Sequence, residues 1–207
     1  GLYVDDLMLG GETAAKALAN EPAKGREFYT PHKAVIKEDS ATTIMRIVFD
    51  ASARASNDTP SLNDCLDIGP PLKNQLWKVL VRGRFHAAAL AGDIRRAFHQ
   101  VRIRAEDRNA LQFDWVNNTD IVRSYRFTRA LFGLEPSPFL LDGVIGQHLD
   151  SQCEELSETV NEIRRGLYVD DLMLGGETAA KALEMKTVAT DIFRKANFDL
   201  HKWNSNA

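Results

Sequence analysis

Cysteine is scarce in this chain of 207 residues: Cys65 and Cys153 are the only two, and neither has a Cys-x-x-Cys partner. This spacing argues against a disulfide scaffold and against a zinc site, and it is typical of proteins from a reducing compartment. The five histidines also stand singly, so the sequence contains no His-x-x-x-His ligand pair. These absences exclude the common metal motifs that are built on cysteine and histidine.

Long apolar runs are missing as well. The apolar stretches are short and interrupted, and no basic-then-apolar signal segment opens the sequence. We therefore expect no membrane partner and an intracellular, cytoplasmic location. Apolar residues still make up 44% of the chain, which is enough for the core of one domain or of two small lobes.

The net charge of −3 hides an uneven distribution. Residues 24–104 contain 14 Lys and Arg against 8 Asp and Glu, whereas residues 105–207 contain 11 against 17. A basic half and an acidic half are compatible with a polyanion along one lobe and metal-binding carboxylates in the other. An ordinary surface with unevenly spread charge gives the same counts.

The sequence contains one perfect repeat. Residues 1–18, GLYVDDLMLGGETAAKAL, are identical to residues 166–183, and the similarity stops there. Structural repeats diverge, so perfect identity over one stretch indicates a recent duplication, a joining error or a scar. We expect residues 1–23 to be adventitious. The chain begins in mid-motif without a methionine, which indicates a fragment.

Alternating hydrophobicity and turn residues predict several strands. Two hairpins are expected, the first from residues 32–40 and 45–52 and the second from residues 109–116 and 122–132. Further strands are expected at 86–94, on both sides of Asp170 and Asp171, and at 199–206. Residues 54–72 are rich in turn formers and predict an ordered loop.

Helical spacing predicts three helices. The first lies within residues 73–85, with Leu76, Val79 and Leu80 on one face. The second covers residues 137–156, with Ser137 as N-cap and Pro138 at the first helical position. The third covers residues 179–198. Together the elements predict an α+β fold in which helices cover one face of an antiparallel sheet.

Two adjacent carboxylates, Asp170 and Asp171, lie between short apolar runs. A tight turn would place both at the tip of a hairpin whose body is buried. Like charges so close beside a core are costly without a cation, so a divalent metal would relieve the cost. An exposed turn is the alternative, because aspartate is a common turn residue.

A third acid, Asp93, follows the small apolar strand HAAALAG and precedes a basic segment. Alone, it would fit a strand-end cap. One carboxylate at a strand end and two at a hairpin tip form a set that can hold two Mg²⁺ ions. Two such ions can activate an attacking 3′-hydroxyl and stabilise departing pyrophosphate in phosphoryl transfer.

The order of these motifs resembles that of a reverse transcriptase. The residues within them resemble those of the Bel-Pao class of long-terminal-repeat retrotransposons. The similar segments are HKAVIKEDSATTIMRIVFDASARAS, SLNDCLDIGPPL, GDIRRAFHQVRI, YRFTRALFGLEPSPFLL, LYVDDLMLGG and FDLHKWNSN. The resemblance implies a right-hand polymerase with fingers and palm and an antiparallel palm sheet covered by helices; thumb sequence is absent from the 207 residues. The implied fingers are residues 24–68 and 101–138, and the implied palm is residues 69–100 and 139–207.

The resemblance also implies the roles of particular residues in the palm. Asp93, Asp170 and Asp171 would hold Mg²⁺, or Mn²⁺ in its place, with the backbone carbonyl of Ile94 as a further ligand. Lys202 would correspond to the lysine that protonates pyrophosphate, and Tyr168 would approach the primer end.

The remaining implied roles concern the nucleotide and the template. Phe98 would stand against the sugar 2′ position and exclude ribonucleotides, although a core phenylalanine fits the pattern too. Lys37 and Arg46 would place positive charge on the incoming triphosphate. The segment that begins with Phe132 and Gly133 would lie under the nascent base pair, and Ser137 would start the helix beside the template.

The chain departs from the family at Glu135 and Pro136, where small hydroxylated residues are more usual. An acid near template phosphates would be mildly repulsive. No thumb, ribonuclease H, protease or integrase sequence is present in the 207 residues, so the rest of a polyprotein is an expected partner. A virus-like particle is an alternative location.

Two functions of different classes follow. The first is RNA-directed DNA synthesis, which adds deoxynucleoside triphosphates to a primer on an RNA or DNA template. The second is an inactive remnant that binds nucleic acid without turnover. An RNA-dependent RNA polymerase shares the metal chemistry but is disfavoured by Phe98, and no extra acid or histidine is spaced for a nuclease.

Overall fold

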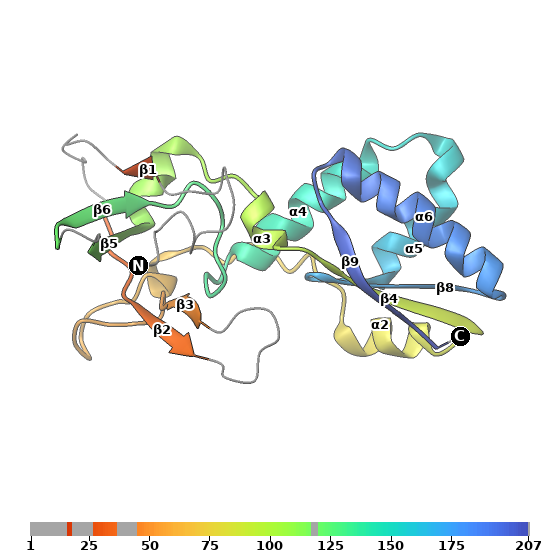
Figure 1. Cartoon of the computed structure of the whole chain (residues 1–207), viewed down its shortest axis with the longest axis horizontal. Coiled ribbons are helices and arrows are strands. Elements are labelled where there is room, and N and C mark those ends of the chain that lie inside the picture. Colours follow the sequence, from red (N-terminus) through yellow and green to blue (C-terminus); the bar gives the residue numbers. More distant parts are fainter. Residues whose placement is uncertain (1–15, 18–26, 37–44, 117–119, 207) are drawn as a thin grey trace. The chain divides into compact units, whose positions relative to one another are not determined.

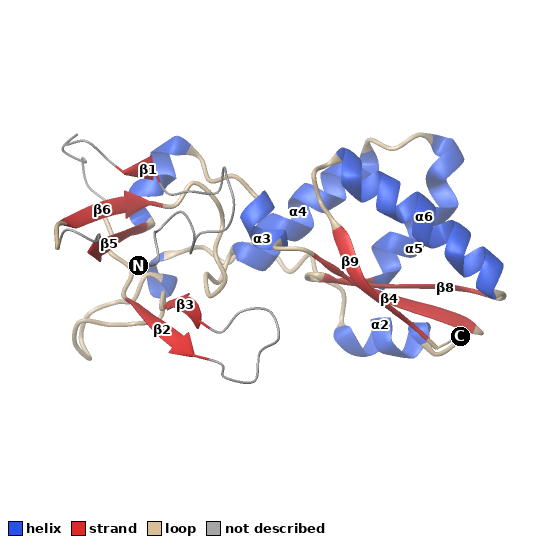
Figure 2. Ribbon diagram, viewed as in Figure 1, coloured by secondary structure: helices blue, strands red, loops and turns tan. Residues whose placement is uncertain are grey.

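The structure, a computed structural model, describes residues 16–17, 27–36, 45–116 and 120–206. The chain divides into two compact units (Figures 1 and 2). Unit 1 is drawn from residues 1–68 and 102–137, and unit 2 from residues 69–101 and 138–207. In the residues that are described, no helix has the length and apolar character needed to cross a membrane.

In its described residues, unit 1 contains two small antiparallel sheets and two short 3-10 helices. The first sheet is the hairpin of β2 and β3, and the second has the strand order β1-β6-β5. The bounds of these elements are β1 Lys16–Ala17, β2 His32–Ile36, β3 Met45–Phe49, η1 Asn63–Cys65, η2 Ala105–Ala110, β5 Gln112–Val116 and β6 Val122–Arg126. Both predicted hairpins are confirmed, although β6 ends at Arg126 rather than at residue 132.

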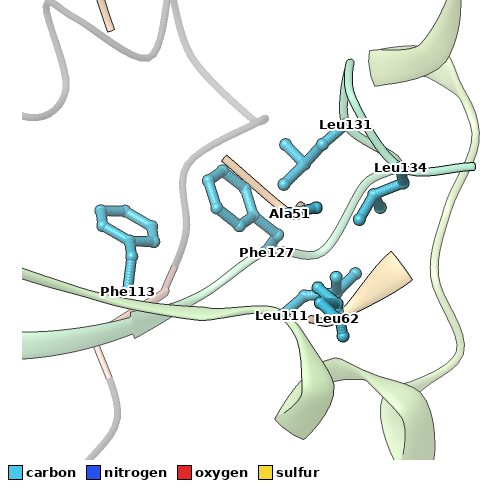
Figure 3. Packing of buried hydrophobic residues seen from close by; sticks show 7 residues of the cluster. All are labelled: Ala51, Leu62, Leu111, Phe113, Phe127, Leu131 and Leu134. Atoms are coloured by element: carbon cyan, nitrogen blue, oxygen red, sulfur yellow. The ribbon is translucent and has the colours of Figure 1, made fainter. Parts of the chain in front are cut away.

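Aromatic rings form the centre of the unit 1 core (Figure 3). Phe113, on β5, is 1% exposed and stacks on Phe127 with ring centroids 4.8 Å apart. Phe49, at the end of β3, meets Phe127 edge to face at 4.7 Å. The two sheets of unit 1 therefore share one core, and burial of each ring contributes about 2–3 kcal/mol.

Unit 2 is built on a four-stranded antiparallel sheet with the order β7-β8-β4-β9. Its helices and strands are interspersed along the chain. Their bounds are α2 Leu76–Gly83, β4 Ala88–Ile94, α3 Ala97–Gln100, α4 Ser137–Asp150, η3 Glu154–Leu156, α5 Ser157–Gly166, β7 Leu167–Tyr168, β8 Asp171–Gly176, α6 Ala179–Lys195 and β9 Leu200–Ser205.

The two faces of this sheet differ, as β8 shows. Leu172 and Leu174 are completely buried and lie on one face, since side chains alternate along a strand. Met173 lies on the other face, where α2 approaches so closely that a Cβ at Gly83 would come within 1.9 Å of its sulfur. Asp171 shares the face of Met173 by the same alternation. The candidate acids therefore lie on the face opposite the main core of unit 2.

The predicted helix over residues 137–156 is wrong in extent. Helix α4 ends at Asp150, where the Ser151 hydroxyl donates to the carbonyl of His148 at 2.7 Å. A separate helix, α5, then runs into the hairpin and was not predicted. Its inward side is the mixed set Thr159, Val160 and Ile163, which carries too little apolar signal to stand out from its charged neighbours.

The predicted face of the first helix is also partly wrong. Val79 is 4% exposed, but Leu76 and Leu80 are 46% and 47% exposed. The helix buries Val79 and Gly83 instead, because the missing side chain at Gly83 lets the backbone approach Met173. The helical spacing thus predicted the position of α2 correctly, but it did not predict correctly which side of the helix is buried.

The first copy of the repeated segment lies almost wholly outside the described residues, including Asp5 and Asp6. Its described part is β1, which pairs with β6 through Lys16 opposite Arg126. The equivalent residues of the second copy, Lys181 and Ala182, are helical in α6. The same dipeptide thus takes two conformations in one chain.

Candidate active site

The second copy of the repeat forms the predicted hairpin, but the prediction that both aspartates lie in its turn is wrong, because Asp171 is already the first residue of β8. Tyr168 on β7 pairs with Asp171 on β8, which leaves Val169 and Asp170 as a two-residue turn. Val169 has a φ of 56°, a left-handed conformation that is costly for a β-branched residue. Such strain is concentrated at functional sites, where the surrounding structure holds it in place.

The third acid lies directly opposite this hairpin. Asp93, next to the last residue of β4, is the cross-strand partner of Asp171. The following amide, Ile94 N–H, donates to the carbonyl of Asp170 at 2.7 Å. Antiparallel partners have Cα atoms about 4.5–5.5 Å apart, so the fold brings the three acids to one end of the sheet.

These carboxylates affect one another. Partial burial raises the pKa of Asp171, and the nearby charges of Asp170 and Asp93 raise it further, whereas Lys202 opposes the shift. Like charges directly opposite each other on a sheet are destabilising. The site therefore concentrates negative charge that a cation would relieve.

A lysine and a histidine on β9 approach Asp93. Lys202 Nζ lies 3.0 Å from Asp93 Oδ2, and His201 Nε2 lies 3.2 Å from the same oxygen. His201 is the cross-strand partner of Asp93. Lys202 follows it with a φ of 50°, in the left-handed region. The structure thus brings Lys202 to the acids, and it adds His201, which the sequence did not single out.

The donor set suits a hard divalent ion, since Mg²⁺ and Mn²⁺ prefer carboxylate and carbonyl oxygens. The raised pKa of Asp171 shows the charge that such an ion would offset. Within the described ranges, however, no three His, Cys, Asp or Glu side chains converge closely enough to hold a metal as they stand. Asp93 is instead directed to Lys202 and His201.

Phe98 lies on the short helix α3, five residues after Asp93, and is 5% exposed. This burial agrees with the alternative that Phe98 is a core residue, which the sequence left open. Lys37 lies outside the described residues, and so does the side chain of Arg46, whose backbone pairs with Val35 in the first hairpin. The contacts of Lys37 and Arg46 with the incoming triphosphate therefore remain predictions.

The segment from Phe132 to Ser137 belongs to unit 1. Phe132 is 53% exposed, and Gly133 has a φ of 89°, which glycine adopts without strain. Ser137 is not the predicted N-cap: it is the first residue of α4, it is 1% exposed, and its hydroxyl donates to the Leu131 carbonyl at 2.7 Å. The prediction failed because a buried carbonyl took the hydroxyl that would have capped the helix.

Asn63 is a further residue of this region, and the sequence did not indicate it. Its amide nitrogen donates to the carbonyl of Gly133 at 2.9 Å, and its amide oxygen accepts from the backbone N–H of Glu135 at 3.1 Å. The side chain is 7% exposed. It therefore holds both sides of the Gly133 turn in one conformation.

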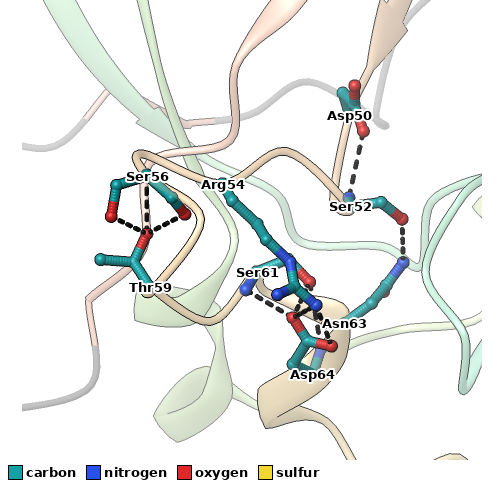
Figure 4. A network of polar contacts seen from close by, with 8 residues as sticks. All are labelled: Asp50, Ser52, Arg54, Ser56, Thr59, Ser61, Asn63 and Asp64. Carbon is teal, nitrogen blue, oxygen red and sulfur yellow. Dashed lines mark hydrogen bonds and ion pairs between the residues drawn. The ribbon is translucent and has the colours of Figure 1, made fainter.

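A polar network fixes Asn63 in turn (Figure 4). Its amide nitrogen also donates to the Ser52 hydroxyl at 3.0 Å. The next residue, Asp64, accepts from the Ser61 backbone N–H at 2.7 Å and pairs with Arg54 at 2.9 Å. The Ser61 bonds are the main reason that the pKa of Asp64 lies below its usual value. The loop that carries Asn63 is thus an ordered support.

Comparison with known proteins agrees with this arrangement. An α+β chain of two units, with paired acids on a hairpin opposite a strand-end acid, has the fold of a polymerase fingers and palm region. Residues 58–203 match the family described as reverse transcriptase (RNA-dependent DNA polymerase). The chain therefore belongs to the reverse transcriptase family. No curated protein matches the sequence.

Solved structures show the same fold. The protease-reverse transcriptase of prototype foamy virus superposes with a TM-score of 0.61 at 20% identity, over 83% of this chain and 20% of that chain. The foamy viral protease-reverse transcriptase in complex with an RNA/DNA hybrid gives a TM-score of 0.61 at 18% identity, over 87% of this chain and 21% of that chain. The chain thus spans about a fifth of the length of these structures.

Proposed function

We propose that this chain is the core of an RNA-directed DNA polymerase that extends a primer with deoxynucleotides. The observation that carries the proposal is the pairing of Asp93 with Asp171, beside the strained turn that holds Asp170. Three carboxylates at one end of a sheet, in a chain of the reverse transcriptase family, are suited to phosphoryl transfer.

The residues that would hold two divalent ions are Asp93, Asp170 and Asp171, with the Ile94 carbonyl as a further ligand. When bound, Mg²⁺ or Mn²⁺ would activate the primer 3′-hydroxyl and stabilise the charge on the leaving pyrophosphate. The protein's own contribution is position: the sheet register fixes Asp93 against Asp171, and the bond from Ile94 N–H to the Asp170 carbonyl fixes the turn.

Lys202 would donate a proton to pyrophosphate as it leaves. Its ammonium lies 3.0 Å from Asp93 and its side chain is 69% exposed, so it can reach a ligand in front of the acids. Tyr168, the partner of Asp171 in the hairpin, would approach the primer end. A positioned general acid contributes typically about 10²–10⁴-fold to a rate.

Unit 1 would act as the fingers and unit 2 as the palm. In unit 1, Lys37 and Arg46 would bind the triphosphate, and exposed Phe132 with Gly133 would lie under the nascent base pair. Ser137 would support this segment through Leu131 rather than contact the template, since its hydroxyl is buried and already bonded. In unit 2, Phe98 would limit the space at the sugar 2′ position.

The residues within the motifs support a finer assignment to the Bel-Pao retrotransposons. The partners would then be an RNA or DNA template with its primer, deoxynucleoside triphosphates, and the protease, ribonuclease H and integrase of a polyprotein. The location would be the cytoplasm or a virus-like particle. The similarity to a foamy viral enzyme whose structure is in complex with an RNA/DNA hybrid supports the nucleic-acid partner.

Primer extension tests the proposal. The 207-residue chain would be given a DNA primer on RNA and on DNA templates, with Mg²⁺ and then Mn²⁺. We expect template-dependent incorporation of deoxynucleotides. Binding of the primed template without any extension would instead support the inactive remnant, and incorporation of ribonucleotides alone would support an RNA polymerase.

A further inference from the structure

Asp93 has a lysine and a histidine contact on a single oxygen. Lys202 Nζ lies 3.0 Å and His201 Nε2 lies 3.2 Å from Asp93 Oδ2, whereas no ion pair is seen for Asp170 or Asp171 among the described residues. The Asp93 carboxyl is 28% exposed, so the contact is partly shielded from water. A carboxylate that would bind a metal is thus already partnered by a lysine.

An irregularity in β9 makes this contact possible. Ala91 pairs with Asn204 and Asp93 with His201, so Gly92 alone on β4 faces both Lys202 and Trp203 on β9. This is a β-bulge, and Lys202 occupies its left-handed position with a φ of 50°, where glycine is usual. In a regular strand, adjacent residues point to opposite faces, so His201 and Lys202 could not both reach Asp93.

The strand therefore accepts backbone strain to place an ammonium on this carboxylate. Asparagine or glycine would suit the bulge better, because both tolerate a positive φ. Trp203, the second residue of the bulge, is turned toward Gly92 and lies under the ammonium of Lys186 on α6. The bulge thus sends the two neighbouring side chains to different surroundings.

We propose that Lys202 is an internal counter-cation, which holds the place of a divalent ion on Asp93 until that ion binds. The proposal rests on the proposed function, in which the acids hold metal and Lys202 acts on pyrophosphate. With a divalent ion bound, Asp93 would contact that ion in place of the ammonium, and the Lys202 ammonium, now 3.0 Å from Asp93, would be available to the leaving group. Lys202 would thus neutralise Asp93 when no divalent ion is bound and act on pyrophosphate when one is.

The structure limits how strongly Lys202 can compete. Its side chain is 69% exposed, and ion pairs at exposed sites contribute about 0.2–1 kcal/mol. Removal of the ammonium should therefore tighten the binding of a divalent ion by about 1.4- to fivefold. A gain of that size is measurable and leaves the lysine displaceable under ordinary conditions.

Binding of Mn²⁺ alone to the full chain, without nucleotide or primer, tests the proposal. Free Mn²⁺ would be followed by electron paramagnetic resonance. Lys202→Asn removes the charge and suits the left-handed backbone, and Lys202→Arg keeps the charge. Lys186→Gln removes one charge from the same unit, where the ammonium lies 5.2 Å from the Trp203 ring. Circular dichroism would check that each variant is folded.

We expect Lys202→Asn to bind Mn²⁺ about 1.4- to fivefold more tightly, and both Lys202→Arg and Lys186→Gln to bind like the unmodified chain. Equal binding by Lys202→Asn and the unmodified chain would overturn the proposal, and so would an equal gain in Lys186→Gln. An Asp170→Asn/Asp171→Asn variant separates the two ideas. If it keeps full Mn²⁺ binding, the proposed metal site itself fails; if it loses binding, only the role of Lys202 is in question.

Discussion

Asp142 gives a prediction about stability whose size can be worked out from the structure. This residue lies on α4, and its Oδ2 atom is buried without a hydrogen-bond partner in the described part of the chain. Burial raises the pKa of Asp142 from 3.8 to about 6, against the opposing charge of Lys73. The folded protein therefore binds a proton more tightly at this site than the unfolded chain does.

The sign follows from the raised pKa. Well below pH 3.8 the carboxyl is protonated in both the folded and the unfolded state, so its ionisation does not oppose folding. As the pH rises through about 6, the folded state has to carry a buried charge, and the free energy of unfolding falls. The full shift would correspond to about 3 kcal/mol. Because the group is only half-buried, water screens part of this cost, and we expect roughly 1–2 kcal/mol.

Asp142→Asn should remove this dependence. Urea unfolding of the variant and the unmodified chain would be compared at pH 4, 5, 6 and 7, so that other titrating groups cancel in the difference. We expect the smallest stability difference at pH 4, and relative to that difference a gain for the variant of roughly 1–2 kcal/mol at pH 7. Glu177→Gln, at an exposed acid in the same unit, should change little. A constant difference from pH 4 to 7, or a variant less stable at pH 7, would refute the reasoning.

Three further substitutions test individual residues. Asn63→Ala should lower the free energy of unfolding by about 2–4 kcal/mol, since the groups at Gly133 and Glu135 lose buried partners, and urea titration should show less than about 1 kcal/mol for Ser52→Ala. Phe98→Ala should cost about 3–5 kcal/mol and increase ribonucleotide incorporation; unchanged sugar preference would leave Phe98 a core residue only. Val169→Gly should raise stability by about 0.5–1 kcal/mol through relief of the φ of 56°, and no gain in thermal unfolding would contradict that strain.

The acids could be predicted from sequence because their arrangement is encoded locally. Apolar runs on both sides of Asp170 and Asp171 define a hairpin, and the alternation of β4 ends at Asp93. The antiparallel register that joins them follows from the buried face of the sheet. Those features require no knowledge of distant contacts.

The supporting residues could not be predicted, since their roles depend on distant contacts. Asn63 forms hydrogen bonds with Gly133 and Glu135, which are 70 and 72 positions away in the sequence. Nothing in the surrounding loop indicates which groups its side chain will contact. The contact of Lys202 with Asp93 depends on a bulge whose left-handed position carries Lys202 itself, so no glycine at that position indicates the bulge in the sequence. Context also decides the conformation of identical segments, since Lys16 is in a strand and Lys181 in a helix.

The central claim is that the second copy of the repeated motif performs chemistry with Asp93. The chain supplies its own control, because the same 18 residues occur at 1–18 and 166–183. The most direct measurement is primer extension on an RNA template by two double variants, Asp170→Asn/Asp171→Asn and Asp5→Asn/Asp6→Asn. We predict that extension disappears in the first and persists in the second. Extension that survives in the first variant, or is lost equally in both, would contradict the account.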